Sequence, residues 1–324
     1  MSVFLTGAGG FLGSAIIDAA SEDRRDLIAL FRPKSGVIAD HERSGLAPVL
    51  GDLRQPGAWQ EALSRASAVI HCAAAPSGDF PTQLAGTVLA TENLLASLPA
   101  HLERFVHVSS FSVYDFSAPR IGGRLDEDTP LESRPLRRDA YTMTKLIQER
   151  MIRAHCRAMG IPLVVVRPGA IYRHVGDWDH GRALRAGPFD LIFAPLASMR
   201  LIHVEDCARA IIAALDAKVC GELVVNLIGD ETTNHWSHHR RARRSGVDTG
   251  IPLPVPYIFI RMAGVAAMVA STLLFKGRAR LPELLDLPRQ QARWRPLRYS
   301  SRRAKAALNW SSIHGSLGQH RQRK

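Results

Sequence analysis

This chain of 324 residues is poor in cysteine, in aromatic residues and in long uncharged apolar runs. It has four cysteines, Cys72, Cys156, Cys207 and Cys220, and none of them forms a CxxC pair. A disulfide framework and a zinc site both need closer or more regular spacing. The cysteines are therefore predicted to be free thiols, and no metal is expected.

Acidic residues are outnumbered by basic ones, 30 against 42, which leaves a formal net charge of +12. Such an excess favours an anionic partner: nucleotide phosphates, a nucleic acid or an anionic membrane surface. Much of the excess lies in residues 238–244 and 300–310. No aromatic interleaving or nucleic-acid motif accompanies it, so both stretches are predicted to be solvated helix faces and no nucleic-acid partner is expected.

The sequence shows no clear targeting segment and one candidate membrane segment. A strand-like run begins at Ser2 and leaves no room for a cleaved signal peptide, so we expect a cytoplasmic protein. Residues 255–275 contain one charge, Arg261, which leaves an uncharged run of 14 residues. That length favours a helix packed on the protein's own core; the alternative is peripheral membrane contact through residues 255–280, with cations at the headgroups.

Short β-rich runs alternate with helix-length amphipathic stretches over the first 228 residues, as in "LIALF", "AVIHCA", "RFVHVSS" and "PLVVVRP". This alternation predicts an α/β fold with a doubly wound parallel sheet of the Rossmann type. We expect a dinucleotide-binding domain over residues 1–228, within which residues 173–199 contribute to the substrate site. After Gly229 no strand pattern is convincing, and residues 229–324 are predicted to be a smaller substrate-binding region.

A glycine-rich turn joins the first predicted strand to the first helix. Gly7, Gly10 and Gly13 stand in "TGAGGFLG" with the spacing GxxGxxG. Glycines at such a place permit a tight turn and a close approach of a pyrophosphate, while the helix N-terminus supplies free N–H groups. The turn predicts a dinucleotide cofactor.

The ends of the next two strands bear on which dinucleotide is bound. Arg32 ends the second strand, where an enzyme that prefers NAD would carry an acidic residue for the ribose hydroxyl. Arg32 and the nearby Lys34 suit a 2′-phosphate, so NADP is favoured and NAD is the alternative. Asp52 follows the third strand, where its carboxylate could accept a hydrogen bond from an adenine amino group.

Two later stretches carry the candidate chemistry. "HVSSFSVYD", residues 107–115, ends a strand with three serines, and "YTMTK" places Tyr141 and Lys145 four residues apart on one helix face. A neighbouring ammonium is expected to lower the pKa of the Tyr141 phenol. The phenol could then exchange a proton with an alcohol or carbonyl oxygen while hydride moves to or from nicotinamide.

The order of these motifs resembles the extended short-chain dehydrogenases/reductases, which include nucleotide-sugar epimerases and 3β-hydroxysteroid dehydrogenases. "TGAGGFLG", "GDL", "HCAA", "VSSFSVY", "YTMTK", "RPGAIY" and "IHVEDCARAI" carry the resemblance across nearly the whole chain. It implies that Tyr141 is the catalytic acid/base, Lys145 its ribose-binding partner and Ser110 the substrate-orienting serine. The implied cofactor contacts are Gly7, Gly10, Phe11, Leu12, Gly13, Asp52, Leu53, Ala73, Ala74, Tyr141, Lys145 and Pro168.

The chain departs from the family pattern at two places. Thr87 stands where the pattern "NVxGTxNLL" has an Asn, which puts any water relay through that Asn in doubt. Phe111 and Ser112 occupy the places of the Asp-Glu pair found in dehydratases, so lyase chemistry is disfavoured.

Three functions stay open at this point: an oxidoreductase acting on a secondary alcohol or ketone, a nucleotide-sugar epimerase with bound NAD, and a cofactor-binding sensor without turnover. The presence of Ser110, Tyr141 and Lys145 favours an enzyme acting on a small molecule. The resemblance also suggests a homodimer.

Overall fold

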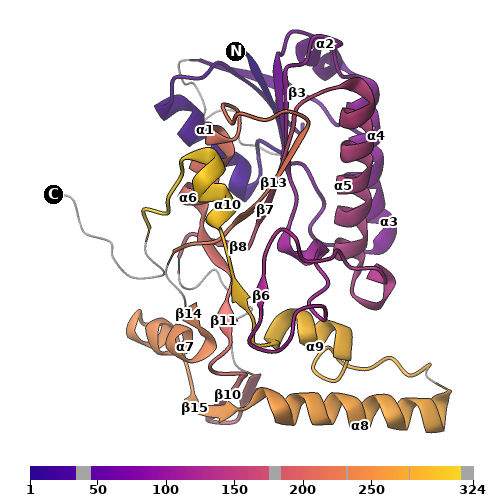
Figure 1. The fold of residues 1–324 in the computed structure, drawn as a ribbon, viewed down its shortest axis with the longest axis vertical. Coiled ribbons are helices and arrows are strands. Elements are labelled where there is room, and N and C mark those ends of the chain that lie inside the picture. The colour runs from indigo at the N-terminus through magenta and orange to yellow at the C-terminus, as the bar shows by residue number, and fades with distance from the viewer. Residues whose placement is uncertain (34–44, 175–183, 231–232, 277, 315–324) are drawn as a thin grey trace.

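The computed structural model describes residues 1–33, 45–174, 184–230, 233–276 and 278–314. A seven-stranded sheet forms its centre (Figure 1), with the strand order β13-β7-β5-β4-β1-β2-β3 and every neighbouring pair parallel. The seven strands are β1 (Val3–Thr6), β2 (Leu27–Phe31), β3 (Leu46–Leu50), β4 (Ala68–His71), β5 (Arg104–Val108), β7 (Leu163–Pro168) and β13 (Glu222–Leu227). The predicted doubly wound parallel sheet is confirmed.

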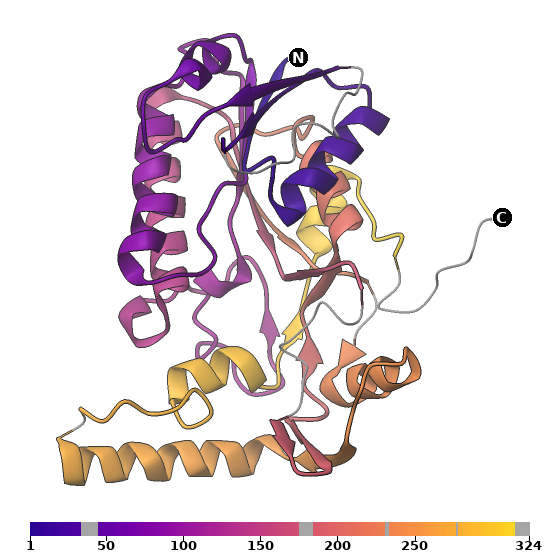
Figure 2. The same cartoon turned by 180° about the vertical axis from the view of Figure 1, so that it is seen from behind.

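Helices cover both faces of the sheet (Figures 1 and 2). One face carries α1 (Phe11–Glu22), α6 (Val204–Ala213) and α10 (Arg302–Leu308), and the other carries α2 (Ala58–Ser64), α4 (Ala90–Ala96) and α5 (Ala140–Met159). Alternate residues of one strand enter the two cores: Val3 and Leu5 pack on the first face and Phe4 on the second. Burial on both faces explains why these strands are continuously apolar.

The amphipathic stretches between the strands form helices with identifiable caps. The stretch that follows β4 consists of α3 (Phe80–Gln83), a π-helical segment η2 (Leu84–Leu89) and then α4. Asp79 begins it as N-cap by accepting a hydrogen bond from Thr82 N at 3.0 Å. Asp139 caps α5 in the same way, with Thr142 N at 2.6 Å, and Gly160 ends α5 in the left-handed conformation.

The strand order positions the site. β1 lies between β2 and β4, so the crossovers on its two sides cover opposite faces of the sheet. Loops that leave the carboxyl ends of β1 and β4 therefore diverge and open a crevice, the usual place of a ligand in such a sheet. Gly7, Ala73 and Ser110 follow β1, β4 and β5 at this edge.

Small strands and three helices lie below that edge. β9 (Leu184–Ala186) and β10 (Phe189–Phe193) form a sheet with β15 (Ile251–Val255), next to α7 (His235–Arg244), α8 (Tyr257–Phe275) and α9 (Leu287–Trp294). The paired short strands are β8 (Ala170–Tyr172) with β12 (Leu201–His203), β11 (Ser198–Met199) with β14 (Thr233–Asn234), and β6 (Arg124–Leu125) with β16 (Arg298–Tyr299). Strands β14, β15 and β16 correct the expectation that none follows Gly229; they are too short to show a periodic pattern.

The two basic stretches are less solvated than predicted. In α7 the side chains of His238 and His239 are buried, and His239 Nε2 lies 2.9 Å from the Asp190 carboxylate. In α10, Ala304 and Leu308 join the core of the central sheet. The chain therefore returns from the lower layer to the sheet after β16, while the predicted domain boundary near residue 228 stays a prediction.

Candidate active site

One cavity of about 1170 Å³ opens at the carboxyl ends of the strands. The structure brings every predicted site residue to its wall: Gly7, Gly10, Phe11, Leu12, Gly13, Arg32, Asp52, Leu53, Ala73, Ala74, Ser110, Tyr141, Lys145 and Pro168. These residues come from seven separate segments of the chain. Motifs that are far apart in the sequence therefore form one site in the folded chain.

The glycine turn is packed too tightly for side chains. Gly7 has φ +76°, and a Cβ added there would lie 2.9 Å from the Ala73 amide nitrogen. A Cβ on Gly13 would come within 2.1 Å of the Gly7 carbonyl oxygen. Gly10 is the N-cap of α1 and offers no side chain to its first turn. The N–H groups of that turn therefore face the cavity uncapped, a cradle suited to phosphate.

Cations gather at the end of the cavity near β2 and β3. Arg32 and Arg54 both line it, and Arg54 holds the Asp52 carboxylate through Nε, at 3.0 Å from both oxygens, and through Nη2 at 2.6 Å. The hydrogen bond from Arg54, together with the charge of Arg32, lowers the pKa of Asp52. Asp52 stays partly exposed, with lone pairs left for a further donor.

Tyr141 and Ser110 meet at the centre of the cavity. Ser110 is the N-cap of the short helix η3 (Phe111–Val113), and its hydroxyl oxygen accepts from Ser112 N at 3.1 Å. Burial raises the pKa of the Tyr141 phenol, and a hydrogen bond with Ser110 opposes that rise. This direction is opposite to the lowered pKa predicted from the YxxxK spacing. Burial has the largest effect on this pKa and the nearby Asp139 carboxylate raises it further, so the phenol stays protonated at neutral pH.

Lys145 is buried one helical turn after Tyr141. Its Nζ donates to the Val108 carbonyl at 2.8 Å and to Gln148 Oε1 at 2.5 Å. An ammonium has three N–H donors, so one remains for the cavity. Burial lowers the pKa of Lys145 to about 8, partly opposed by Glu149 and Cys72. The Val108 carbonyl and Gln148 Oε1 are the acceptors that hold the buried ammonium.

A buried polar network fixes the acceptor Gln148. Because Lys145 can only donate, Oε1 of Gln148 faces it, and the amide NH₂ faces Thr91 Oγ1 at 2.8 Å, the Ala73 carbonyl at 3.1 Å and His71 Nε2 at 3.0 Å. The other ring nitrogen of His71, Nδ1, lies 2.7 Å from Thr6 Oγ1. Burial and the Lys145 charge lower the pKa of His71 to about 3, which keeps the ring neutral.

Thr87 has a structural contact at the position where the family pattern has Asn. Its hydroxyl accepts from the Ala75 amide at 3.0 Å and so holds the loop after β4. Its carbonyl accepts from Thr91 Oγ1 at 2.6 Å, which links it to the Gln148 network. Thr87 therefore holds the loop after β4 in the cavity wall. The side chain that contacts Lys145 is Gln148.

A second buried cluster ties the serine motif to α5. Ser109 Oγ donates to Glu149 at 2.6 Å, and Arg167 of β7 pairs with the same carboxylate. The Arg167 guanidinium lies 4.7 Å from the centre of the Tyr114 ring, whose hydroxyl donates to Asn226 at 2.7 Å. With its hydroxyl bound to Glu149, Ser109 leaves Ser110 as the serine beside Tyr141.

The far end of the cavity is lined by four arginines, Arg138, Arg200, Arg289 and Arg293. Arg138 and Arg200 both lie over the Phe116 ring, at 5.3 and 4.7 Å from its centre. The carboxylate of Glu132 lies 3.8 Å from Arg138 and that of Glu283 3.0 Å from Arg293. This wall suits a substrate that carries an anionic group.

Sequence reasoning missed Arg54, Gln148 and the four arginines. Arg54 directly follows the "GDL" motif and Gln148 follows Lys145 by three residues, so helix and turn spacing could have indicated both. Arg138, Arg200, Arg289 and Arg293 come from distant segments, and no local pattern connects them.

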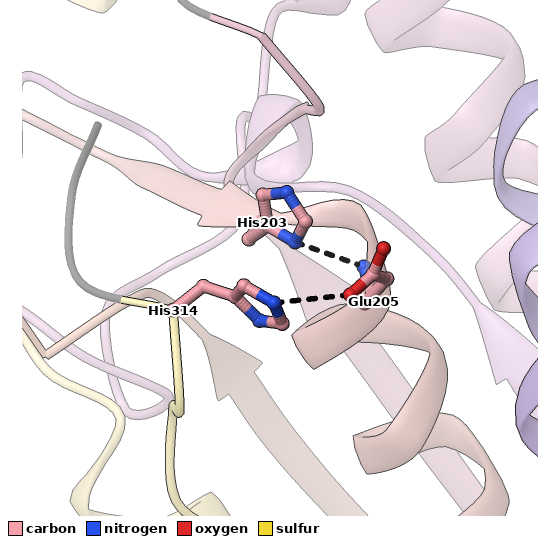
Figure 3. A group of neighbouring side chains, drawn as sticks. All are labelled: His203, Glu205 and His314. Atoms are coloured by element: carbon pink, nitrogen blue, oxygen red, sulfur yellow. Dashed lines mark hydrogen bonds and ion pairs between the residues drawn. The ribbon is translucent and has the colours of Figure 1, made fainter. Parts of the chain in front are cut away.

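A separate cluster of His203, Glu205 and His314 lies where α6 begins (Figure 3). His314 Nε2 lies 3.0 Å from Glu205 and its Nδ1 3.1 Å from the buried Asp206. The rings of His203 and His314 stack with centres 4.1 Å apart and planes 22° apart, so their nitrogen lone pairs run side by side rather than converging. The arrangement fits polar contacts that anchor the segment after α10 better than it fits a metal site.

Known proteins share this fold and these motifs. The model of the NAD dependent epimerase/dehydratase family matches residues 3–227. The chain is 27% identical over 175 residues to a 2-alkyl-3-oxoalkanoate reductase of Stenotrophomonas maltophilia, covering 53% of this chain and 51% of that protein. It is 25% identical over 254 residues to an uncharacterized UDP-glucose epimerase of Bacillus subtilis, covering 71% and 78%.

A solved structure extends the likeness beyond the matched residues. The UDP-glucuronic acid 4-epimerase from Bacillus cereus in complex with NAD superposes with a TM-score of 0.69 at 21% identity, covering 97% of this chain and 94% of that one. At that identity the likeness shows the fold. The resemblance predicted from the sequence is confirmed: the chain belongs to the NAD-dependent epimerase/dehydratase family.

Proposed function

We propose that this protein is an NADP-dependent oxidoreductase that interconverts a ketone and a secondary alcohol at Ser110, Tyr141 and Lys145. The observation that carries the proposal is that Ser110, Tyr141 and the buried Lys145 line the same cavity as the glycine turn. The similarity to a 2-alkyl-3-oxoalkanoate reductase supports a ketone as substrate.

The chain's own residues perform the proton transfer. Ser110 orients the substrate oxygen, and Tyr141, which burial keeps protonated, donates its proton to that oxygen as a ketone is reduced. Lys145 stabilises the phenolate that remains, because its charge lies in a buried and weakly screened site. Arg138 and Arg200 suit an anionic group on the same substrate.

A nicotinamide dinucleotide fits the opposite end of the cavity. Gly7, Gly10 and Gly13 leave room for its pyrophosphate, Asp52 and Leu53 line the adenine end, and Ala73, Ala74 and Pro168 lie toward the nicotinamide. When bound, the cofactor supplies or accepts the hydride. Arg32 and Arg54 add positive charge at the ribose end, which supports NADP over NAD.

Epimerisation is the second candidate function, because relatives of both kinds align with this chain. In that reaction the cofactor stays bound and is reduced and reoxidised within one turnover. Retention of NAD through purification and tight binding of a UDP-sugar would favour it over the reductase.

The decisive experiment compares wild type with Tyr141→Phe on a panel of ketones, alcohols and UDP-sugars, with NADPH or NADH. We expect loss of at least a hundredfold in kcat, since general acid catalysis contributes about 10²–10⁴-fold, with cofactor binding retained. Unchanged turnover in Tyr141→Phe would refute the assigned chemistry. Arg32→Ala should lose the preference for NADPH; an unchanged preference would remove Arg32 from the assignment.

The remaining expectations stay proposals. We place the cofactor domain within residues 1–228 and assign residues 173–199 and 229–324 to substrate binding, although α10 packs on the cofactor sheet. Residues 175–183, 231–232, 277 and 315–324 of these ranges lie outside the described residues. A cytoplasmic location, a homodimer and contact of residues 255–280 with a membrane complete the proposal. A narrow stripe of α8 is buried and the rest is exposed, which corrects the expectation of a core helix and supports membrane contact.

A further inference from the structure

Helix α8 is apolar on nearly every side, with Arg261 as its one charged residue, and yet lies on the surface. Among the described residues it is the one helix long and apolar enough to cross a membrane, and 17% of its apolar window is buried in the protein. It runs along the base of the molecule below α9 and extends past the central sheet (Figures 1 and 2). A helix that is apolar all round is normally enclosed by protein or by lipid.

A narrow stripe of α8 holds it against the protein. The buried residues Tyr257, Ile260, Gly264 and Ser271 share one helix face. A Cβ on Gly264 would lie 2.7 Å from the Leu287 side chain, so α9 packs directly on α8. Gln290 Nε2 also donates to the Ile260 carbonyl at 2.7 Å. These contacts fix α8 alongside the base of the protein.

The opposite face of α8 offers apolar side chains alone. By helix geometry it carries Ile258, Phe259, Met262, Val269 and Leu273, which are between 47 and 77% exposed. The strand β15 leads into α8 and exposes Ile251 and Leu253 as well. Large apolar side chains gathered and exposed in this way mark an interaction site.

The charge around this surface identifies the partner. Residues 276–282 at the end of α8 carry three cations, Lys276, Arg278 and Arg280, and no aspartate or glutamate. Arg261 also belongs to α8, but its Nη1 is buried in the protein. A second copy of the chain would bring the same cations against them, which disfavours a pair formed through α8. Anionic lipid headgroups complement the cations, and acyl chains accept the apolar face.

We propose that α8 docks this protein on an anionic lipid bilayer, lying in the plane of the membrane with Ile258, Phe259, Met262, Val269 and Leu273 inserted and the flanking cations at the headgroups. The 19 residues of α8 span about 28 Å, which would suffice to cross a bilayer. The buried stripe from Tyr257 to Ser271 instead holds α8 against the protein along most of that length. The helix therefore lies in the interface.

Docking would bring one wall of the cavity near the lipid. The helix that packs on α8, α9, contributes Arg289, Ala292 and Arg293 to the cavity lining. A membrane-resident ketone or alcohol could then reach the site from the bilayer, a consequence that rests on the proposed function. The docking itself does not depend on that function.

The test is cosedimentation of the full chain with lipid vesicles, either neutral phosphatidylcholine or phosphatidylcholine with 30% phosphatidylglycerol. We expect binding to the anionic vesicles that weakens with added salt and with the neutral lipid. Met262→Glu/Leu273→Glu should lower the partition coefficient at least tenfold. The control Met159→Glu/Leu89→Glu, which changes exposed Met and Leu side chains away from α8, should bind like wild type.

Other outcomes would overturn the proposal. These are equal vesicle binding by wild type and Met262→Glu/Leu273→Glu, or no binding of wild type to either vesicle. A wild-type dimer that this double variant converts to a monomer, without vesicle binding, would assign the surface to a second copy. Resistance to alkaline carbonate extraction would show a spanning helix and refute the in-plane arrangement. Each outcome is read without turnover, so it is separable from failure of the proposed reaction.

Discussion

Replacing Gln148 with Met tests whether the buried network controls the charge of Lys145. Methionine has a similar length and volume, so the change removes the amide while largely preserving packing. Lys145 loses the Oε1 acceptor at 2.5 Å and keeps the Val108 carbonyl at 2.8 Å. His71 Nε2 loses its contact with Gln148 at 3.0 Å and keeps the one with Thr91 Oγ1 at 2.9 Å.

The size of the effect follows from the lost hydrogen bond. A hydrogen bond to a charged group contributes about 1.5–3 kcal/mol, and one pKa unit corresponds to about 1.4 kcal/mol. The pKa of Lys145, already lowered to about 8 by burial, should fall by a further one to two units. The groups around the ammonium, His71, His107, Cys72 and Glu149, remain in the variant.

The assay is the pH dependence of kcat/KM. Activity that needs the Lys145 ammonium is lost as pH rises through its pKa, so in Gln148→Met the alkaline limb should move down by one to two pH units. The control Gln290→Met removes another buried glutamine, which bonds the Ile260 and Leu284 carbonyls. Gln290→Met should be less stable than wild type but should keep the alkaline limb of the kcat/KM profile at the same pH. If Gln148→Met folds and its alkaline limb also stays at the wild-type pH, Gln148 does not set the pKa of Lys145.

Two further predictions concern the fold that supports the site. Gly13→Ala should lower the free energy of unfolding by about 1–3 kcal/mol or more and weaken NADPH binding, because the new Cβ would lie 2.1 Å from the Gly7 carbonyl oxygen. Urea unfolding measures the stability, and fluorescence titration measures the binding. The control is Gly57→Ala, whose new Cβ would lie 3.6 Å from its nearest neighbour. Burial lowers the pKa of His71 and His235 to about 3, below the ordinary 6.5. Below pH 6.5 both histidines are therefore protonated in the unfolded chain and neutral in the folded chain, so the stability of the fold falls as the pH drops. Each histidine should contribute about 2 kcal/mol of loss between pH 6.5 and 5 in urea unfolding, and a midpoint that holds constant over that range would contradict the neutral buried rings.

Local sequence patterns were enough to predict the parallel sheet and the motifs that form the site. The apolar strands of four to six residues and the amphipathic helices follow from the periodicity of neighbouring residues, and so do Gly7 and Gly13 at the turn. Tyr141 and Lys145 lie on one face of α5 because residues four apart are neighbours on any α-helix. These features depend on residues close in sequence, and the structure agrees with them.

Tertiary structure alone decided the electrostatics of the site and the exposure of α8. The direction of the Tyr141 pKa depends on how deeply the phenol is buried, and Gln148 meets His71 across 77 residues of chain. The apolar stretch that forms α8 has no clear amphipathic period, so its sequence could not distinguish a core helix from a surface one. Burial and contacts between distant segments depend on how the whole chain folds, so they cannot be predicted from a short stretch of neighbouring residues.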